Sequence, residues 1–439
     1  MIQILLLLAS IAFIVLGTTK LKLHPFLTLL GAGLILGLLS GLAGSEVLAA
    51  ISSGFGKTLG GIGIVITFGT IIGTYLERNG GARVVAHSLL KLVGDKRSPL
   101  AINLTGAIVS IPVFCDSGFV ILSTLNRALS KRTGIPLIVF AIALATGLYT
   151  THVFVPPTPG PLAAATALEA DLGLVLLFGI IVSIPVTLAG WLWATRLGKG
   201  VVQAPAEPEE TVSNEIPSVS LMSALGPILL PIVLIALKSI ADYPSHPFGE
   251  NGFAQFLSTI GSPMIALFFG VVLAMSIGGK SVRENRFEWV GDALRNAGTI
   301  ILITGAGGAF GSVLRASGVA DYIGTSLVDW QMGLLLPFLL AALLKSAQGS
   351  STVSIITTAA LMAPLMNPLG LTDPVMRALV VLTIGAGAMT VSHVNDSYFW
   401  VVSQFSDLDT RAALKGHTLG SLVLGLSGLV IINVISWVI

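Results

Sequence analysis

Long apolar segments recur along the whole chain and are separated by short polar loops. A helix needs about 20 apolar residues to cross the hydrocarbon core of a bilayer, and most of these segments approach that length. The pattern therefore predicts an all-α polytopic membrane protein. Ten spans are expected, at residues 2–18, 24–43, 59–76, 135–168, 172–195, 220–241, 254–278, 297–314, 374–405 and 418–438.

The first segment has no basic residue before it and is followed by Lys20 and Lys22. A secretory signal peptide would carry its positive charges before the apolar run. We therefore interpret residues 2–18 as a retained span.

Two further apolar segments, 98–126 and 332–366, predict re-entrant hairpins. Basic residues flank the first segment on both sides, and such residues favour the cytoplasmic face. The segment should therefore enter and leave by the same face. Its 29 residues are too few for two complete spans, and Pro112 near its middle breaks the helix.

Similar stretches of sequence occur twice, in the same order. Gly69, Gly73, Leu76 and Gly80 match Gly307, Gly311, Leu314 and Gly318 at a constant offset of 238 residues. Residues 121–124 resemble 355–358, and 145–153 resemble 386–394. The chain is therefore predicted to hold one repeat over 1–198 and a second over 220–439, joined by a polar linker at 199–219. We expect the glycine pairs to be packing contacts.

The positive charges orient this map. With both termini outside, 18 of the 23 Lys and Arg residues fall in cytoplasmic loops. The same map sends the span 59–76 inward and its counterpart 297–314 outward, so the two repeats are inverted. Inverted repeats with broken helices are typical of secondary transporters.

Polar stretches interrupt the apolar segments at residues 112–118, 150–161, 345–352 and 392–397. Backbone leaves helical form within a bilayer only where protein or a water-filled cavity satisfies its polar groups. The segments 135–168 and 374–405 are accordingly predicted to be broken helices. The N-termini of half-helices present free N–H groups and positive dipole ends, which suit an anionic substrate.

The side chains at these breaks are the candidate site. Ionisable groups within a membrane are costly and usually functional. Asp116, Asp396, His152 and His393 are the candidates for proton coupling. Helix capping is the alternative for all four, and the two aspartates could also orient a neighbouring group. For Lys345 two roles stay open, at the membrane interface or as a positive charge in the site. The predicted substrate-binding residues are Ser117, Gly118, Thr150, Thr151, His152, Thr158, Gln348, Gly349, Ser350, Ser351, Thr352, His393 and Asn395.

Composition removes other classes of function. The net charge of +2 has a membrane explanation and indicates no nucleic acid partner. No metal-ligand spacing, phosphate loop or nucleotide-binding domain is present, so no cofactor or metal is expected and an ion gradient would drive transport. Cys115 is the single cysteine.

The residues at the breaks resemble those of the gluconate permease family of bacterial sugar-acid/proton symporters. The run Thr151-His-Val-Phe-Val-Pro-Pro-Thr-Pro-Gly-Pro161 is similar to one family motif. Ser392-His-Val-Asn-Asp396 with Phe399-Trp400, and Gly349-Ser-Ser-Thr-Val353, resemble two others. The resemblance covers the whole chain. It implies inverted repeats with two re-entrant hairpins, an elevator-like motion of a site-bearing domain, and a scaffold that dimerises.

We therefore expect a transporter of the bacterial inner membrane that imports gluconate or a related small hydroxycarboxylate with protons. It should not be an enzyme. Sodium stays open as the coupling ion, and a hydroxy amino acid such as D-serine as the substrate. A membrane-embedded hydrolase and a channel are the alternatives from other classes.

Overall fold

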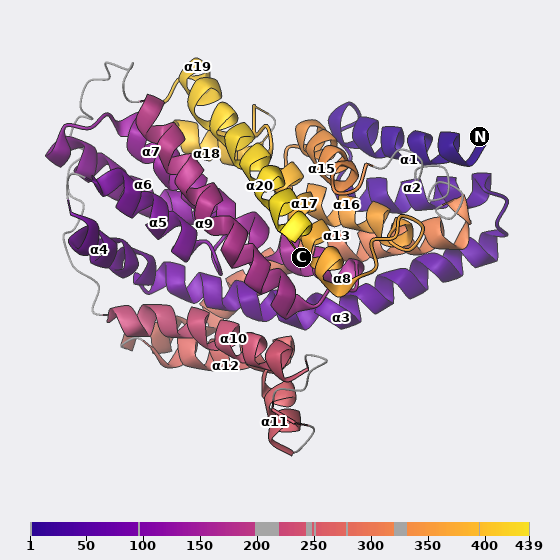
Figure 1. The fold of residues 1–439 in the computed structure, drawn as a ribbon, viewed down its shortest axis with the longest axis horizontal. Coiled ribbons are helices and arrows are strands. Elements are labelled where there is room, and N and C mark those ends of the chain that lie inside the picture. Colours follow the sequence, from indigo (N-terminus) through magenta and orange to yellow (C-terminus); the bar gives the residue numbers. More distant parts are fainter. Residues whose placement is uncertain are drawn as a thin grey trace.

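The computed structural model describes residues 2–94, 97–197, 219–242, 248–249, 252–277, 280–319, 332–394 and 396–438. In these ranges every regular element is helical (Figure 1). The N-terminal half of the chain contains α1 (Ile2–Thr19), α2 (Pro25–Leu39), α3 (Gly44–Arg78), α4 (Gly81–Val93), α5 (Ser98–Val109), α6 (Cys115–Thr133), α7 (Leu137–Phe154), α8 (Pro159–Ala167) and α9 (Leu172–Leu197). The C-terminal half contains α10 (Leu221–Ala241), α11 (Gly252–Ile260), α12 (Pro263–Ser276), α13 (Lys280–Ala316), α15 (Leu335–Gln348), α16 (Ser351–Met362), η4 (Ala363–Leu365), α17 (Pro374–Met389), α18 (Ser397–Phe405), α19 (Thr410–Ala413), η5 (Leu414–Thr418) and α20 (Leu419–Val438).

Two long helices, α3 and α13, pack against each other and form a layer on one side of the molecule (Figure 1). They contain 35 and 37 residues, and α2 lies against α13. At the end of α3, Arg78 forms ion pairs with Asp292 and Glu288 of α13. We call this layer of α3 and α13 the scaffold.

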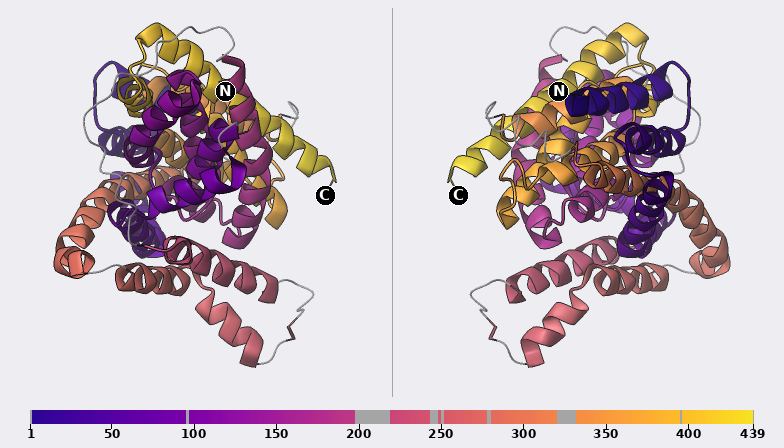
Figure 2. Two further views of the ribbon diagram at one scale, coloured as in Figure 1. Left: turned by 90° about the vertical axis from the view of Figure 1, so that its left-hand side faces the viewer. Right: turned by 90° about the vertical axis from the view of Figure 1, so that its right-hand side faces the viewer.

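Helices α10, α11 and α12 project from the main body (Figure 2). Helix α12 packs against both α10 and α3, and α10 also contacts α4 and α9. Helices α11 and α12 meet at a bend of 62°. The predicted span 254–278 therefore corresponds to a bent pair of helices. Helix α12 begins after the bend with Pro263, and proline suits the first turn of a helix.

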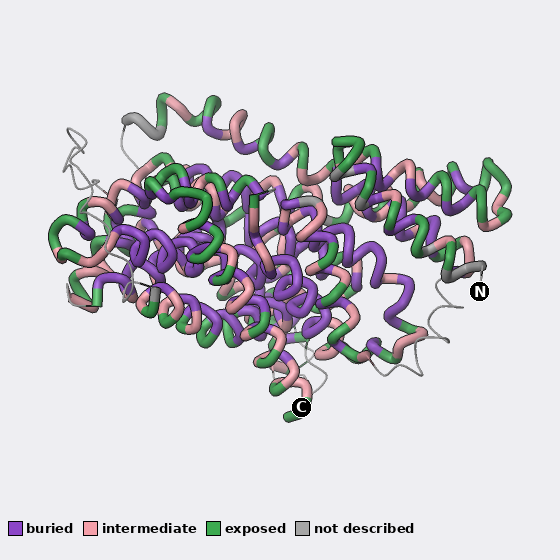
Figure 3. Tube along the Cα trace, turned by 90° about the horizontal axis from the view of Figure 1, so that it is seen from above, coloured by how far each residue is buried: buried purple, intermediate pink, exposed green. Residues whose placement is uncertain are grey.

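The centre of the molecule is the most deeply buried part (Figure 3). All 18 residues of α7 are buried, because α5, α6, α9, α17 and α20 surround this helix. Glycines permit the closest crossings. A Cβ atom on Gly147 of α7 would lie 2.0 Å from the carbonyl oxygen of Asn103 on α5. We call α5–α9, α15–α18 and α20 the site body.

The helices follow the predicted spans, with differences in extent. By length and composition five of the described helices can cross a membrane, or seven if each of two bent pairs is one span. The count of ten spans therefore stays a prediction. The spans expected at 59–76 and 297–314 were too short, since they are the apolar ends of α3 and α13. Residues 44–58 and 280–296 are more polar, so hydropathy alone overlooked them, together with the amphipathic α4.

Each predicted hairpin segment contains two short helices. Segment 98–126 holds α5 and the start of α6, joined by residues 110–114. Segment 332–366 holds α15 and α16, joined by Gly349 and Ser350. Their course relative to a bilayer, the inversion of the repeats and the positions of the termini stay predictions. Of the expected linker 199–219, only Val219 is among the described residues.

Candidate functional site

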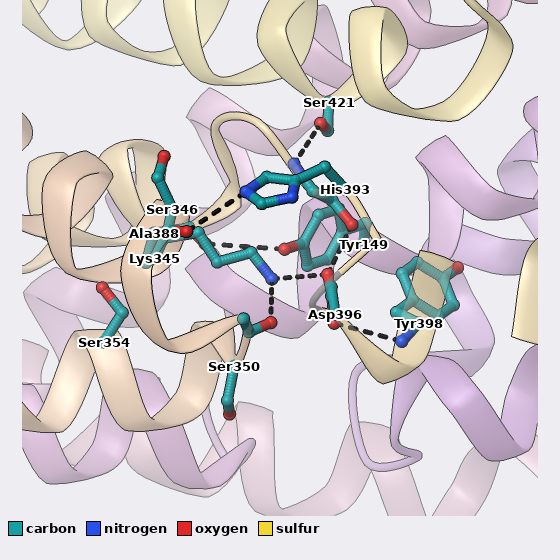
Figure 4. A network of polar contacts seen from close by, with 12 residues as sticks. Tyr149, Lys345, Ser346, Ser350, Ser354, Ala388, His393, Asp396, Tyr398 and Ser421 are labelled. Atoms are coloured by element: carbon teal, nitrogen blue, oxygen red, sulfur yellow. Dashed lines mark hydrogen bonds and ion pairs between the residues drawn. The ribbon is translucent and has the colours of Figure 1, made fainter. Parts of the chain in front are cut away.

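A buried ion pair joins α15 to the break between α17 and α18. Lys345 Nζ lies 2.5 Å from Asp396 Oδ2, and their side chains are 0% and 4% exposed. The same ammonium donates a hydrogen bond to the carbonyl oxygen of Gly349, at 2.6 Å (Figure 4). One lysine thus connects the turn of the α15–α16 hairpin to the second broken helix. The interface role considered for Lys345 is excluded, because its side chain is fully buried.

The carboxylate of Asp396 accepts two further hydrogen bonds. It caps α18 by accepting a hydrogen bond from the Tyr398 backbone N–H at 3.1 Å. It also accepts from the hydroxyl of Ser392, which lies 2.9 Å from Nε2 of His417. These contacts hold Asp396 in one orientation between Lys345 and the start of α18. The sequence made Asp396 a candidate but showed none of these partners.

Aromatic side chains close the pair off from solvent. The ring centroid of Tyr149 lies 5.7 Å from Lys345 Nζ, so the ring face contacts the cation. The Tyr149 hydroxyl lies near Ser351 and donates a hydrogen bond to the carbonyl oxygen of Ala388 at 3.5 Å (Figure 4). Tyr398 packs on Tyr149 and donates a hydrogen bond to the carbonyl oxygen of Ala145 at 3.0 Å. The pair therefore lies where low polarity strengthens its electrostatic interactions.

The N-terminal half of the chain contributes Asp116 to the same region. Asp116 lies in the first turn of α6, whose N-terminus has no side-chain cap. It is close enough to Asp396 and Lys345 for their charges to interact. Its Oδ1 atom is buried and has no hydrogen-bond partner among the described residues. The fold thus brings together one lysine and two carboxyl groups that are far apart in the sequence.

His152 lies beside this cluster, at the end of α7. Its ring is 5.9 Å from the ring of Phe114, and its Nδ1 atom is buried without a partner among the described residues. It is also close enough to Lys345 and Asp396 for electrostatic interaction. His393 is different, since its Nε2 lies 3.1 Å from the carbonyl oxygen of Ser346. This contact matches the capping alternative for His393.

The predicted threonines bond to the protein backbone. Thr150, Thr151 and Thr158 donate to the carbonyl oxygens of Thr146, Ala107 and Val155, at 2.8, 2.7 and 2.7 Å. Their hydroxyl hydrogens are therefore used, and only oxygen lone pairs are left for a ligand. Thr158 also lines a narrow crevice between α3, the α5–α6 connection and the α7–α8 break. The other residues that line it are Gly69, Thr70, Pro112, Phe114, Pro157 and Pro159.

The remaining predicted residues have mixed positions. Ser350 caps α16 through Val353 N, and Ser351 and Thr352 form its first turn. Gly118 is a packing position, because an added Cβ would lie 2.6 Å from Leu148 Cδ2. Ser117 is partly buried in α6, and Gln348 ends α15. Asn395 lies outside the described residues.

Sequence reasoning missed Tyr149, Tyr398, Ser392 and His417 as neighbours of the pair. Tyr149 lies in one of the repeated stretches and Ser392 in a quoted motif, so both carried a weak signal. His417 carried only the signal of a histidine in an apolar segment. In the part of the chain that the structure describes, no group of three His, Cys, Asp or Glu side chains could hold a metal ion.

Known proteins resemble this chain over its full length. The model of the GntP family permeases matches residues 2–438. The gluconate permease of Pseudomonas aeruginosa is 34% identical over 440 residues, covering 98% of this chain and 97% of that protein. The D-serine transporter DsdX of Escherichia coli is 33% identical over 427 residues, covering 95% and 94%.

The fold also has a solved counterpart. The structure of MtrF from Neisseria gonorrhoeae, which is described within a class of antimetabolite efflux pumps, superposes with a TM-score of 0.66. It is 15% identical in sequence and the match covers 96% of both chains, so the likeness concerns the fold. The full-length family match and the identities above 30% lead to one conclusion: this chain belongs to the GntP family of permeases.

Proposed function

We propose that this permease imports gluconate or a related small hydroxycarboxylate together with protons. Its site would be the buried cluster of Lys345, Asp396 and Asp116, which is the observation that carries the proposal. Family membership and the gluconate permease relative support the substrate class. A membrane-embedded hydrolase is set aside, because the family consists of permeases.

The charges of the cluster suit the joint binding of an anion and a proton. With both carboxyl groups ionised, the cluster carries one positive and two negative charges. A substrate carboxylate adds a third negative charge in a site where uncompensated charge is costly. One proton on a carboxyl group restores the original balance. Asp116 is the proposed acceptor, since its buried Oδ1 has no partner among the described residues.

Helix N-termini support the anionic part of the proposal. Helices α6, α16 and α18 all begin at the breaks, next to Asp116, Gly349 and Asp396. Their first N–H groups carry positive partial charge, and α6 has no side-chain cap to neutralise it. A substrate at the cluster would therefore meet oriented dipoles as well as the ammonium of Lys345.

A hydroxy amino acid such as D-serine is the second candidate. A zwitterion carries an ammonium group in addition to its carboxylate, and Asp116 offers a buried carboxylate oxygen without a partner among the described residues. The relative DsdX, a D-serine transporter, supports this alternative. Competition distinguishes the two candidates. Other sugar acids should inhibit uptake if the substrate is gluconate, and other hydroxy amino acids should inhibit it if the substrate is D-serine.

The proposed mechanism is an elevator-type movement of the site body against α3 and α13. We further propose that the protein acts as a homodimer in the bacterial inner membrane. In this proposal the hairpins α5–α6 and α15–α16 carry the site, while the scaffold stays fixed in the bilayer.

Uptake by proteoliposomes tests the function. Labelled gluconate should accumulate when an inward proton gradient is imposed, and a protonophore should abolish accumulation. Counterflow by preloaded unlabelled gluconate would be expected of a carrier and not of a channel. Accumulation driven by a sodium gradient without a pH gradient would show that the coupling ion is sodium and not the proton. Transport of D-serine but not gluconate would favour the second candidate.

Asp116→Asn tests the assignment of the proton acceptor. Asparagine keeps the size of the side chain but cannot take up and release the proton. We expect gradient-driven accumulation of gluconate to be lost, whereas exchange of internal for external gluconate is reduced less. Both are measured in the same proteoliposomes. Accumulation equal to the wild-type level would show that Asp116 does not carry the proton.

A further inference from the structure

We propose that Lys345 binds the carboxylate group of the substrate, and that Asp396 occupies the same ammonium when the substrate is absent. Asp396 is thus an internal competitor of the substrate. This inference rests on the proposed function, because it assumes that an anion or a zwitterion enters the cluster. It adds the residue that recognises the carboxylate and the residue that sets its affinity.

The burial of Lys345 is the first argument. Among the residues whose side chains the structure describes, Lys345 is the only Lys or Arg that is buried. A buried ion pair contributes little net stability, because the cost of desolvating both charges offsets their attraction. This ion pair lies where the turn of the α15–α16 hairpin meets the break between α17 and α18. Its position therefore favours a role in binding over a role in stability.

The hydrogen-bonding capacity of the ammonium is the second argument. It has three N–H donors, of which one bonds to Gly349 O and another to Asp396 Oδ2. The Tyr149 ring contacts the cation, and the third donor has no oxygen acceptor among the described residues. A carboxylate that approaches Lys345 could bond to this donor first and then take the place of Asp396.

Asp396 would keep two hydrogen bonds if its ion pair with Lys345 were broken. Its carboxylate would keep the hydrogen bonds from Ser392 Oγ and from the Tyr398 backbone N–H. Lys345 would also stay paired, because the substrate supplies the replacement carboxylate. The exchange therefore leaves no buried cation alone, which is the expensive outcome in a site of low polarity.

Other titratable groups surround the pair and could modify the exchange. From the elements packed around it they are Cys115 and Asp116 on α6, Tyr149 and His152 on α7, Tyr398 on α18, His417 on η5, and His393 in the break before α18. None of them is a second permanent cation. The proposed role of Lys345 is therefore tested through charge selectivity at one fixed pH.

Binding to the purified protein in detergent, measured by calorimetry, tests the inference with gluconate and its neutral amide. Wild-type protein should prefer gluconate. In Asp396→Asn the competing negative charge is absent while the cap of α18 can still form, so gluconate should bind about tenfold more tightly. Because this change takes the ion-pair partner from Lys345, folding of the variant is checked by thermal melting. Affinity for the amide should change much less.

The second variant removes the cation. Lys345→Met alone would leave Asp396 buried without a counter-charge, so the change is made as Lys345→Met with Asp396→Asn, and folding is checked by thermal melting. The double variant should lose the preference for gluconate over the amide. The matched control is Lys238→Met with Asp242→Asn, an ion pair on α10, which should leave the preference unchanged.

The outcomes separate the two proposals. If wild-type protein binds neither gluconate nor D-serine, the proposed function fails and the inference fails with it. If wild-type protein binds gluconate but the Lys345 double variant keeps the wild-type preference, only the role of Lys345 is wrong. Weaker binding of gluconate by Asp396→Asn would refute the competition.

Discussion

The hydroxyl groups of α16 illustrate how single residues differ in function within one helix. Ser351 and Ser354 are both buried and lie within one turn of each other. Ser354 donates a hydrogen bond to the carbonyl oxygen of Ala341 at 2.7 Å and so connects α16 to α15. Ser351 instead lies at the N-terminus of the helix, near the hydroxyl of Tyr149. We therefore propose that Ser354 stabilises the hairpin and that Ser351 contributes to substrate binding.

Alanine at these two positions should have different effects. Losing a bonding partner in a desolvated site costs about 1–3 kcal/mol, or roughly a 5- to 150-fold loss in affinity. We expect Ser351→Ala to weaken gluconate binding within that range, with little change in melting temperature. Ser354→Ala should lower the melting temperature and leave affinity nearly unchanged. Calorimetry and thermal melting of both variants measure these effects, and unchanged binding by Ser351→Ala would contradict its assignment.

At the scale of helices, the repeated glycines lie where the scaffold contacts the site body. A Cβ atom on Gly73 of α3 would lie 2.2 Å from the carbonyl oxygen of Pro112, between α5 and α6. On α13, a Cβ on Gly311 would lie 3.1 Å from the carbonyl oxygen of Ala360 on α16. Glycines that correspond in the two predicted repeats thus contact the two hairpin segments. Their role as packing positions accounts for the similarity of sequence.

Gly73→Ala should disturb this contact, because the methyl group meets backbone and not a movable side chain. Overpacking typically costs about 1–3 kcal/mol. We expect a lower melting temperature and slower gluconate uptake. Gly60→Ala is the matched control on α3, since a Cβ atom there has no neighbour within 4 Å. Alanine is the better helix former by roughly 1 kcal/mol, so this control should melt at the same or a higher temperature. Equal behaviour of the two variants would argue against the close contact.

At the scale of the whole molecule, the lengths of the hairpin helices limit their possible course in the bilayer. Helix α5 has 12 residues and α16 also has 12, which corresponds to about 18 Å of helix each. The hydrocarbon core is about 30 Å thick, so neither helix can cross it alone. A re-entrant course for both hairpins is consistent with these lengths, and the basic residues at both ends of the first hairpin favour it.

Cysteine labelling tests the first hairpin. In a protein without Cys115, cysteines introduced as Arg97→Cys and Lys131→Cys should both react with a membrane-impermeant reagent from the cytoplasmic side. Both positions are exposed, whereas the neighbouring Ser130 is buried and would label poorly. Labelling from opposite sides would refute the hairpin and the inverted arrangement of the repeats together.

The sequence by itself determined the helical class, the positions of the breaks and the family. These follow from local signals, namely apolar runs of helix length, prolines and polar residues inside such runs, and motifs of adjacent residues. The same signals placed Asp116, His152 and Asp396 at breaks. They also underestimated α3 and α13, because the polar halves of these helices become stable helix only through packing against each other and against α2.

Only the tertiary structure decided which of these residues meet. Lys345 and Asp396 are 51 positions apart, and Asp116 comes from the other repeat. A lysine near the end of an apolar helix could equally extend to the membrane surface, and its local sequence does not distinguish the two courses. The packing of α15 against α17, with Tyr149 of α7 over the cation, buries Lys345 and selects Asp396 as its partner. Since charge pairing in the interior depends on such long-range contacts, the sequence made Asp116 and Asp396 candidates and left the role of Lys345 open, but it did not predict the pair at the centre of the cluster.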